Sequence, residues 1–258
     1  MHWWFPADAS SIGGKVDALF YAILYITGAV FVLTEATLLI FIVKYRHRQG
    51  RKAAYVEGSK KAEIIWTAIP AVILVTLALV SLPVWAKIKY YSHFPRDASP
   101  LAIEAKQYQW NVTYPGPDGK ISSGNNSDDD DFMKVDSLYL VVNQNYVVDL
   151  TSRDVVHSFF VPAFRIKQDL VPGMDIKLWM RPTKTGRFEI ACAELCGLGH
   201  YRMRGLVFVQ TPREHAEWLV GQGEASAADS VTAGLKPAPA AAAAPAARGA
   251  TSRGKGAS

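Results

Sequence analysis

The sequence predicts a two-helix transmembrane hairpin, then an all-β domain, and finally a tail without stable structure. Two long apolar stretches, residues 18–43 and 64–86, lie in the first third of the chain. Short runs rich in β-branched and aromatic residues follow them, and the C-terminal stretch consists mainly of Ala, Pro, Gly and Ser. We therefore divide the chain into an N-terminal segment (1–15), a helical hairpin (16–88), a folded domain (89–222) and a disordered low-complexity tail (223–258).

The two apolar stretches are expected to span a lipid bilayer. The first contains one charged residue, Glu35, and the second contains none. Each exceeds the roughly 20 apolar residues that cross a hydrocarbon core, and a soluble core helix rarely runs so long without charge. The N-terminus lacks the basic residues of a cleaved signal peptide. A carboxyl inside a membrane is costly, so Glu35 should face other protein, and its role is open.

The charge distribution predicts the orientation of the hairpin. The connection at residues 44–61 carries seven Lys or Arg and one Glu. Short loops with this excess stay in the cytoplasm, which places both termini and the folded domain on the periplasmic side of a bacterial inner membrane. Residues 89–222 hold 15 basic and 16 acidic residues, so this domain is nearly neutral although the whole chain is +5. A neutral domain does not favour nucleic-acid binding.

The runs between residues 100 and 212 favour an antiparallel sandwich or barrel. Examples are "LYLVVNQNYVVDLTS", "HSFFVPAF" and "GLVFVQT", with Gly, Pro and Asp between the runs. "REHAEWLVGQ" then predicts a short helix. The polar segment 124–134 contains four consecutive Asp, which indicates either a solvated insertion or a patch that attracts a basic partner protein.

The only two cysteines lie in "IACAELCGLGHYRM", residues 190–203. Cys192 and Cys196 are followed by His200 and Met203. Two cysteines in an oxidising compartment usually form a disulfide. A single helix face is disfavoured because glycines interrupt the stretch and strand-like runs flank it. Thiolate, thioether and imidazole groups together are typical copper ligands, so a metal site is the third interpretation.

A copper site of this kind needs a second histidine. His157 in "DVVHSFFVP" is the best candidate, because it follows a β-rich run from which another loop of a sandwich could meet the cysteine stretch. The alternative is a hydrogen-bonded packing histidine among aromatic residues. From the residues alone, both the disulfide and the metal site remain open.

At this point the motifs resemble a known family. "CAELCGLGHYRM", "DVVHSFFVPAFRIKQDLVPGM" and the hairpin resemble subunit II of cytochrome c oxidase, over most of residues 15–220. The resemblance implies a cupredoxin-like Greek-key barrel with a dinuclear copper centre, CuA. It also implies that the chain accepts electrons from a c-type cytochrome and passes them to haem in subunit I. That subunit, with other oxidase subunits, reduces oxygen to water and pumps protons.

The resemblance also assigns roles to single residues. It implies that Cys192 and Cys196 bridge two copper ions and that the carbonyl of Glu194 is an axial ligand. The side chain of Glu194 would also reach a magnesium ion shared with subunit I. The remaining implied ligands are His157 and His200, one for each copper, and the weak axial ligand Met203. The second copper rests on the resemblance alone.

Three further positions match family features. "KAEIIWTAIPA" places Glu63 at the cytoplasmic entrance of a proton path into subunit I, although a carboxylate is also favourable at any helix start. "AKQYQWNVTYPG" makes Tyr108 and Trp110 candidates for the place where the electron enters. The family commonly has Trp where Tyr108 aligns, which is a departure.

Other classes of protein remain as alternatives. One is a membrane-tethered binding module with a Cys192–Cys196 disulfide. A second is the copper-free subunit of a quinol oxidase, and a third is the soluble copper domain of nitrous oxide reductase. The chain has no C-x-x-C-H motif, so the c-type haem domain carried by some oxidase relatives is not expected here.

Overall fold

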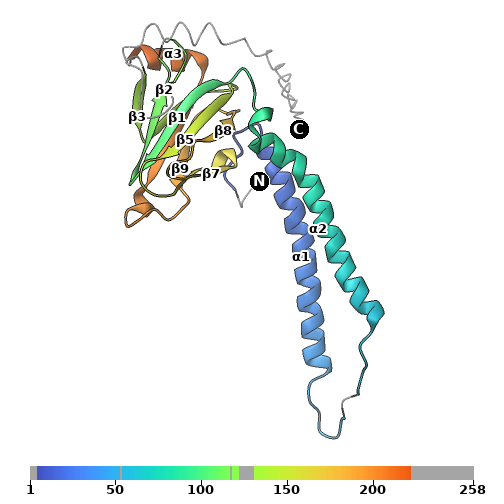
Figure 1. Ribbon diagram of the computed structural model, residues 1–258. Helices are drawn as coiled ribbons and strands as arrows, with labels where there is room; N and C mark the ends of the chain where they lie inside the picture. The colour runs from blue at the N-terminus through green and yellow to red at the C-terminus, as the bar shows by residue number, and fades with distance from the viewer. Residues whose placement is uncertain (1–4, 53, 117, 122–130, 222–258) are drawn as a thin grey trace, which may run out of the picture.

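The computed structural model describes residues 5–52, 54–116, 118–121 and 131–221. The low-complexity tail at 223–258 and three residues of the acidic run, 128–130, lie outside the described residues. Two long helices are joined to a β domain (Figure 1).

The hairpin consists of α1 (Gly13–Lys44) and α2 (Lys60–Lys89). Both helices are long and apolar enough to cross a membrane, with mean hydropathies of 2.3 and 2.4 in their most apolar windows, and none of either window is buried within the chain. A helix that is apolar all round needs lipid or other protein around it. Ser59 caps α2 by accepting a hydrogen bond from the Ala62 amide at 3.4 Å. Glu35 is exposed on α1 and Glu63 is exposed in the first turn of α2.

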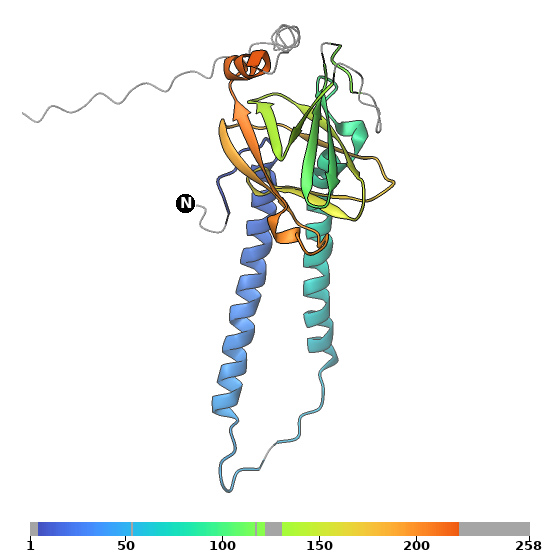
Figure 2. The ribbon, with the colours of Figure 1, turned by 90° about the vertical axis from the view of Figure 1, so that its left-hand side faces the viewer.

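Two five-stranded sheets form the domain, which is a β-sandwich as predicted (Figures 1 and 2). The first sheet has the order β3-β2-β1-β5-β8, and the second has the order β4-β10-β9-β6-β7. The first comprises β1 (Ser99–Lys106), β2 (Gln109–Tyr114), β3 (Phe132–Val135), β5 (Tyr146–Ser152) and β8 (Ile176–Met180). The second comprises β4 (Ser137–Val141), β6 (His157–Val161), β7 (Ile166–Leu170), β9 (Gly186–Cys192) and β10 (Arg204–Gln210). Short 3-10 turns η1 (Tyr91–His93), η2 (Pro162–Phe164) and η3 (His200–Arg202), and the helix α3 (Pro212–Gly221), complete the elements.

The expectation of purely antiparallel pairing is wrong at two places. β1 pairs with β5 in parallel, and β4 pairs with β10 in parallel. The reason is that the chain crosses between the sheets: after β1, β2 and β3 it adds β4 to the second sheet, then returns with β5 beside β1. Strands joined by such a crossover can run in the same direction, whereas a tight hairpin makes neighbours antiparallel.

The core lies between the two sheets. β5 alternates buried and half-buried residues along its whole length, as expected for a strand with one face on the core. Trp110, Phe159 and Phe164 are the largest fully buried side chains. Burial of each such side chain contributes about 1.5–3 kcal/mol, so this layer holds the sheets together and fixes the strand ends that carry the site.

A buried ion pair attaches the hairpin to the domain. Arg165, which follows η2, directs Nε to Asp17 Oδ1 at 2.6 Å and Nη2 to Asp17 Oδ2 at 3.0 Å. Its Nη2 also donates to the Pro6 carbonyl at 2.9 Å. A bidentate guanidinium–carboxylate pair restricts orientation as well as distance, so the first turns of α1 are held firmly against the domain.

Candidate metal centre

The cysteine stretch folds into a loop between two paired strands. β9 ends at Cys192 and β10 begins at Arg204, and the Cys192 amide donates to the Met203 carbonyl at 3.1 Å where the loop closes. The stretch is therefore not a continuous helix, as its glycines indicated. This loop, residues 193–203, lies at the edge of the β domain on the side from which the helical hairpin extends (orange in Figures 1 and 2).

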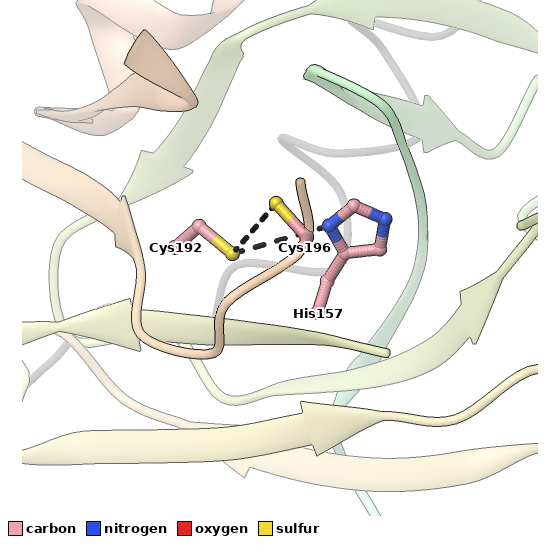
Figure 3. Close-up of side chains that lie close together, drawn as sticks. All are labelled: His157, Cys192 and Cys196. Atoms are coloured by element: carbon pink, nitrogen blue, oxygen red, sulfur yellow. Dashed lines mark hydrogen bonds between the residues drawn. The ribbon is translucent and has the colours of Figure 1, made fainter. Parts of the chain in front are cut away.

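The sulfur and imidazole donors converge where this loop meets the end of β9 and the start of β6. Cys192 and Cys196 are free thiols with their sulfurs 3.9 Å apart, about twice the length of a disulfide bond. His157 Nδ1 lies 3.9 Å from Cys192 Sγ, and the three donor atoms of His157, Cys192 and Cys196 all lie within 4.8 Å of one another (Figure 3). The two cysteines are thus arranged around a common point without being joined.

Three further predicted residues lie around the two sulfurs. His200 Nδ1 is 3.5 Å from Cys196 Sγ, and Met203 Sδ is 3.8 Å from the same sulfur. The carbonyl oxygen of Glu194 is 3.2 Å from Cys192 Sγ, while the Glu194 side chain is exposed. The structure therefore gathers all six residues that the resemblance implies as ligands.

Burial makes the site suited to a soft metal ion. His157, Cys196 and Met203 are exposed by 3% or less. Burial, together with the neighbouring Cys192, raises the pKa of the Cys196 thiol to about 12. The thiol therefore keeps its proton in the metal-free chain, and a metal ion must displace that proton on binding. Two thiols, two imidazoles and a thioether fit copper, which favours this donor set.

Asp154 positions His157, a role that the sequence reasoning missed. Its Oδ1 accepts hydrogen bonds from His157 Nε2 at 2.8 Å and from the Val155 amide at 2.7 Å, and its Oδ2 accepts from the Gln107 amide at 2.7 Å. Burial alone would raise the pKa of Asp154, but the hydrogen bonds from Gln107, His157 and Val155 lower it overall. With Nε2 donating to the carboxylate, Nδ1 presents its lone pair towards Cys192. The Asp-x-x-His spacing was the available signal.

Replacing Asp154 should loosen the metal site. We expect Asp154→Ala to lower copper affinity by about 10- to 100-fold, because the imidazole loses the acceptor that fixes its tautomer and orientation. Asp154→Asn keeps one acceptor oxygen and should lose less. Asp169→Asn is the matched control, because Asp169 bonds Ser158 Oγ at 2.7 Å and not the imidazole. Titration against a competing chelator measures all three, and equal affinity of Asp154→Ala and the native chain would contradict the role.

The two aromatic candidates lie at different depths beside the loop. Tyr108 is half-buried and packs against the loop backbone: a Cβ added at Gly199 would lie 2.5 Å from its ring, and one at Gly197 would lie 2.6 Å from its hydroxyl. The neighbouring Gln107 donates to the Cys196 carbonyl at 2.6 Å. Trp110 is fully buried, with its ring edge-on to His157 at 6.3 Å between centroids. Only Tyr108 of the pair therefore reaches the surface.

Comparisons with known proteins agree with this geometry. Residues 1–84 match the family described as cytochrome C oxidase subunit II, transmembrane domain, and residues 101–210 match its periplasmic domain. The alternative cytochrome c oxidase subunit 2 of Bradyrhizobium diazoefficiens is 34% identical over 238 residues, which cover 85% of this chain and 84% of the relative. The chain belongs to the cytochrome c oxidase subunit II family.

Other relatives extend the same comparison. Cytochrome c oxidase subunit 2 of Thermostichus vulcanus is 30% identical over 269 residues, covering 84% of this chain and 78% of the relative. Among solved structures, the periplasmic domain of subunit II from Bradyrhizobium japonicum is 29% identical and covers 51% of this chain and 99% of that chain, with a TM-score of 0.42. Membership of the family, shown by the matching family models and by the Bradyrhizobium diazoefficiens relative, makes the chain an electron-transfer subunit of a haem–copper oxidase complex, and its converging thiols lie in the part that matches the periplasmic domain.

Proposed function

We propose that this subunit accepts electrons from a c-type cytochrome at a dinuclear copper centre and passes them to haem in subunit I. The observation that carries the proposal is the convergence of two free thiols, two imidazoles, a thioether and a carbonyl at one place, where loop 193–203 meets the end of β9 and the start of β6. Bound copper would supply a one-electron carrier. The copper-free subunit of a quinol oxidase would have no use for this donor set, and the hairpin argues against the soluble nitrous oxide reductase domain.

The arrangement of donors supports two ions. Cys192 has the His157 imidazole and the Glu194 carbonyl beside it, whereas Cys196 has the His200 imidazole and the Met203 thioether. Each thiol therefore has one strong and one weak neighbouring donor. Two similar half-sites with two shared sulfurs between them suit a pair of ions, because a single four-coordinate ion would leave two of the six donors unused.

The position of the loop supports transfer towards the membrane. Loop 193–203 lies at the domain edge that faces along α1 and α2 (Figures 1 and 2). A partner embedded beside the hairpin would therefore lie next to the copper ligands. The exposed Glu194 side chain lies on the same loop, and we assign it a magnesium ion shared with subunit I. Metal analysis of the assembled oxidase should find this magnesium, and its absence would remove the assignment.

Rapid mixing tests the proposed electron transfer. The full chain loaded with copper is mixed with a reduced c-type cytochrome, and haem oxidation is followed together with loss of the copper absorption. We expect the two changes to share one rate. Copper-free chain is the control and should leave the haem reduced. Equal haem oxidation by the copper-free chain, or none by the loaded chain, would contradict the proposal.

Glu63 is proposed as the entrance of a proton path into subunit I. It is exposed in the first turn of α2, where a carboxylate is also favoured by the helix dipole. Glu63→Gln in the assembled oxidase should slow steady-state turnover while copper reduction by the cytochrome keeps its rate. Glu57→Gln, which changes a carboxyl in the loop before α2, is the control. Unaltered turnover of Glu63→Gln across pH would leave only the helix-start role.

The hairpin loop is proposed to lie in the cytoplasm of a bacterium. This orientation is inferred from the seven Lys or Arg between the spans, because short loops rich in Lys and Arg stay in the cytoplasm. A cysteine introduced by Gly50→Cys, at an exposed loop position, should resist a membrane-impermeant thiol reagent in intact cells and react after lysis. The chain without the added cysteine is the control for the native thiols Cys192 and Cys196, and labelling above that control before lysis would reverse the orientation.

A further inference from the structure

A cavity lies where the two spanning helices meet the β domain. Its volume is about 610 Å³, which is within the range of roughly 300–1,000 Å³ for small-ligand sites. Its walls come from the start of α1, the end of α2, the segment after η1 and the end of β8. Ile12, Val84, Ile88 and the buried Trp179 form an apolar side, and Trp179 is held by donating Nε1 to the Lys87 carbonyl at 3.1 Å.

Three cationic side chains also line this cavity and make part of its wall positively charged. Lys15, Lys87 and Arg181 line it, and no lining residue is a carboxylate. Within the part of the chain that the structure describes, none of the three forms an ion pair. Lys89, in the same last turn of α2 as Lys87, does not line the cavity, and its ammonium group donates to Gln168 Oε1 at 2.6 Å. Three positive charges, none of them in an ion pair within the described residues, thus line one cavity beside an apolar wall.

The cavity lies at the end of the hairpin that adjoins the β domain. Lys15 lies in the first turn of α1 and Lys87 in the last turn of α2, so both stand at the same end of the hairpin. Leu82 and Trp85, which flank the lining residues Pro83 and Val84 along α2, are 54% and 49% exposed. Apolar surface for acyl chains therefore runs from the cavity into the region of the spans, and the cations stand at the level of lipid headgroups.

We propose that this cavity binds the headgroup of an anionic phospholipid from the periplasmic leaflet. The phosphate lies among Lys15, Lys87 and Arg181, the glycerol rests on the apolar side, and the acyl chains follow α1 and α2 into the bilayer. The recognised chemistry is a phosphate diester with one uncompensated negative charge, as in phosphatidylglycerol. Free phosphate matches the cations, but it would use neither the apolar wall nor the opening towards the spans. The bound lipid links the hairpin to the domain.

Native mass spectrometry of the assembled oxidase tests the site. The complex is exchanged into detergent with phosphatidylglycerol, with phosphatidylcholine or with inorganic phosphate, and retained molecules are counted. We expect phosphatidylglycerol to stay bound. Lys15→Gln with Lys87→Gln should weaken its binding by about fivefold for each lysine removed, and Lys15→Arg with Lys87→Arg should restore it. Lys89→Gln is the matched control, because it removes a cation near the same end of α2 that points away from the cavity.

Any of four other outcomes of this experiment would overturn the proposal. Equal retention of phosphatidylglycerol by the native and the double Gln variants would show that the cations do not hold it. Equal retention of phosphatidylcholine would show that charge is not recognised. Binding of inorganic phosphate without the lipid would make this a soluble-anion site. Loss of a neighbouring subunit from the double Gln variant, with the lipid unchanged, would show that protein covers the cavity. The copper absorption of every variant confirms that the domain is folded.

Discussion

Cys196→Ser is expected to abolish copper binding at the centre. The Cys196 sulfur lies between three donors, at 3.9 Å from Cys192 Sγ, 3.5 Å from His200 Nδ1 and 3.8 Å from Met203 Sδ. Serine has nearly the same shape, so the loop should keep its fold. A hydroxyl, however, is a hard and weakly acidic ligand that cannot replace a thiolate shared between two copper ions. Copper analysis and the visible spectrum of the purified chain should both show the loss.

Met203→Leu is the matched variant for this prediction. Met203 is as deeply buried as Cys196 and belongs to the same loop, so both changes disturb the same packing. A thioether binds copper weakly, and its replacement should therefore leave the copper bound and shift its reduction potential. If Cys196→Ser retained full copper with an unchanged spectrum, the bridging role of this thiol would be wrong. If Met203→Leu lost copper to the same extent, the loss would reflect packing of the loop.

Tyr108→Ala is expected to slow electron acceptance by about 30-fold, which corresponds to roughly 2 kcal/mol for the loss of an aromatic contact at the centre of an interface. Tyr108 is half-buried, and its ring touches the backbone at Gly197 and Gly199, on either side of Leu198 and next to His200. Trp110 cannot substitute for it at the surface because its ring is fully buried. Stopped-flow reduction of the copper centre by the native cytochrome measures the rate.

Tyr108→Phe keeps the ring and removes only the hydroxyl, so it should retain most of the rate. Both rates should show the same proportional loss at low and high salt, because the contact is aromatic and not ionic. Leu198→Ala provides the matched change on the loop itself, since Leu198 is 97% exposed. If Tyr108→Ala accepted electrons at the rate of the native chain, the contact with the cytochrome would lie elsewhere on the domain.

Local patterns in the sequence predicted the hairpin and the β domain, but not the pairing of every strand. The hairpin was predictable because residues 18–43 form an apolar run with a single charged residue, which is long enough to cross a bilayer and is rare in soluble core helices. The β-sandwich was predictable from short runs rich in β-branched and aromatic residues with Gly, Pro and Asp between them, and the alternate burial along residues 146–152 agrees with one of these runs. The parallel pairing of β1 with β5 was not predictable, because it depends on the crossover between sheets and leaves no periodic signal in either strand.

The functional site, too, was only partly predictable from the sequence. Cys192, Cys196, His200 and Met203 were recognisable because they lie within twelve residues and share soft-donor chemistry. Asp154 was missed because a carboxylate in a polar turn has many ordinary explanations, and only its distance to the His157 imidazole gives it a role. The three cations of the cavity are 166 positions apart along the chain at their extremes, Lys15 and Arg181, so only the fold brings them together.

Copper stoichiometry with electron paramagnetic resonance on the full chain tests the dinuclear centre most directly. Each thiol has its own imidazole and its own weak donor, and this pairing predicts two copper ions per chain that share one unpaired electron. The expected result is a copper-to-protein ratio of two and a hyperfine pattern from two equivalent copper nuclei. A ratio of one with the hyperfine pattern of a single copper nucleus would contradict the dinuclear centre.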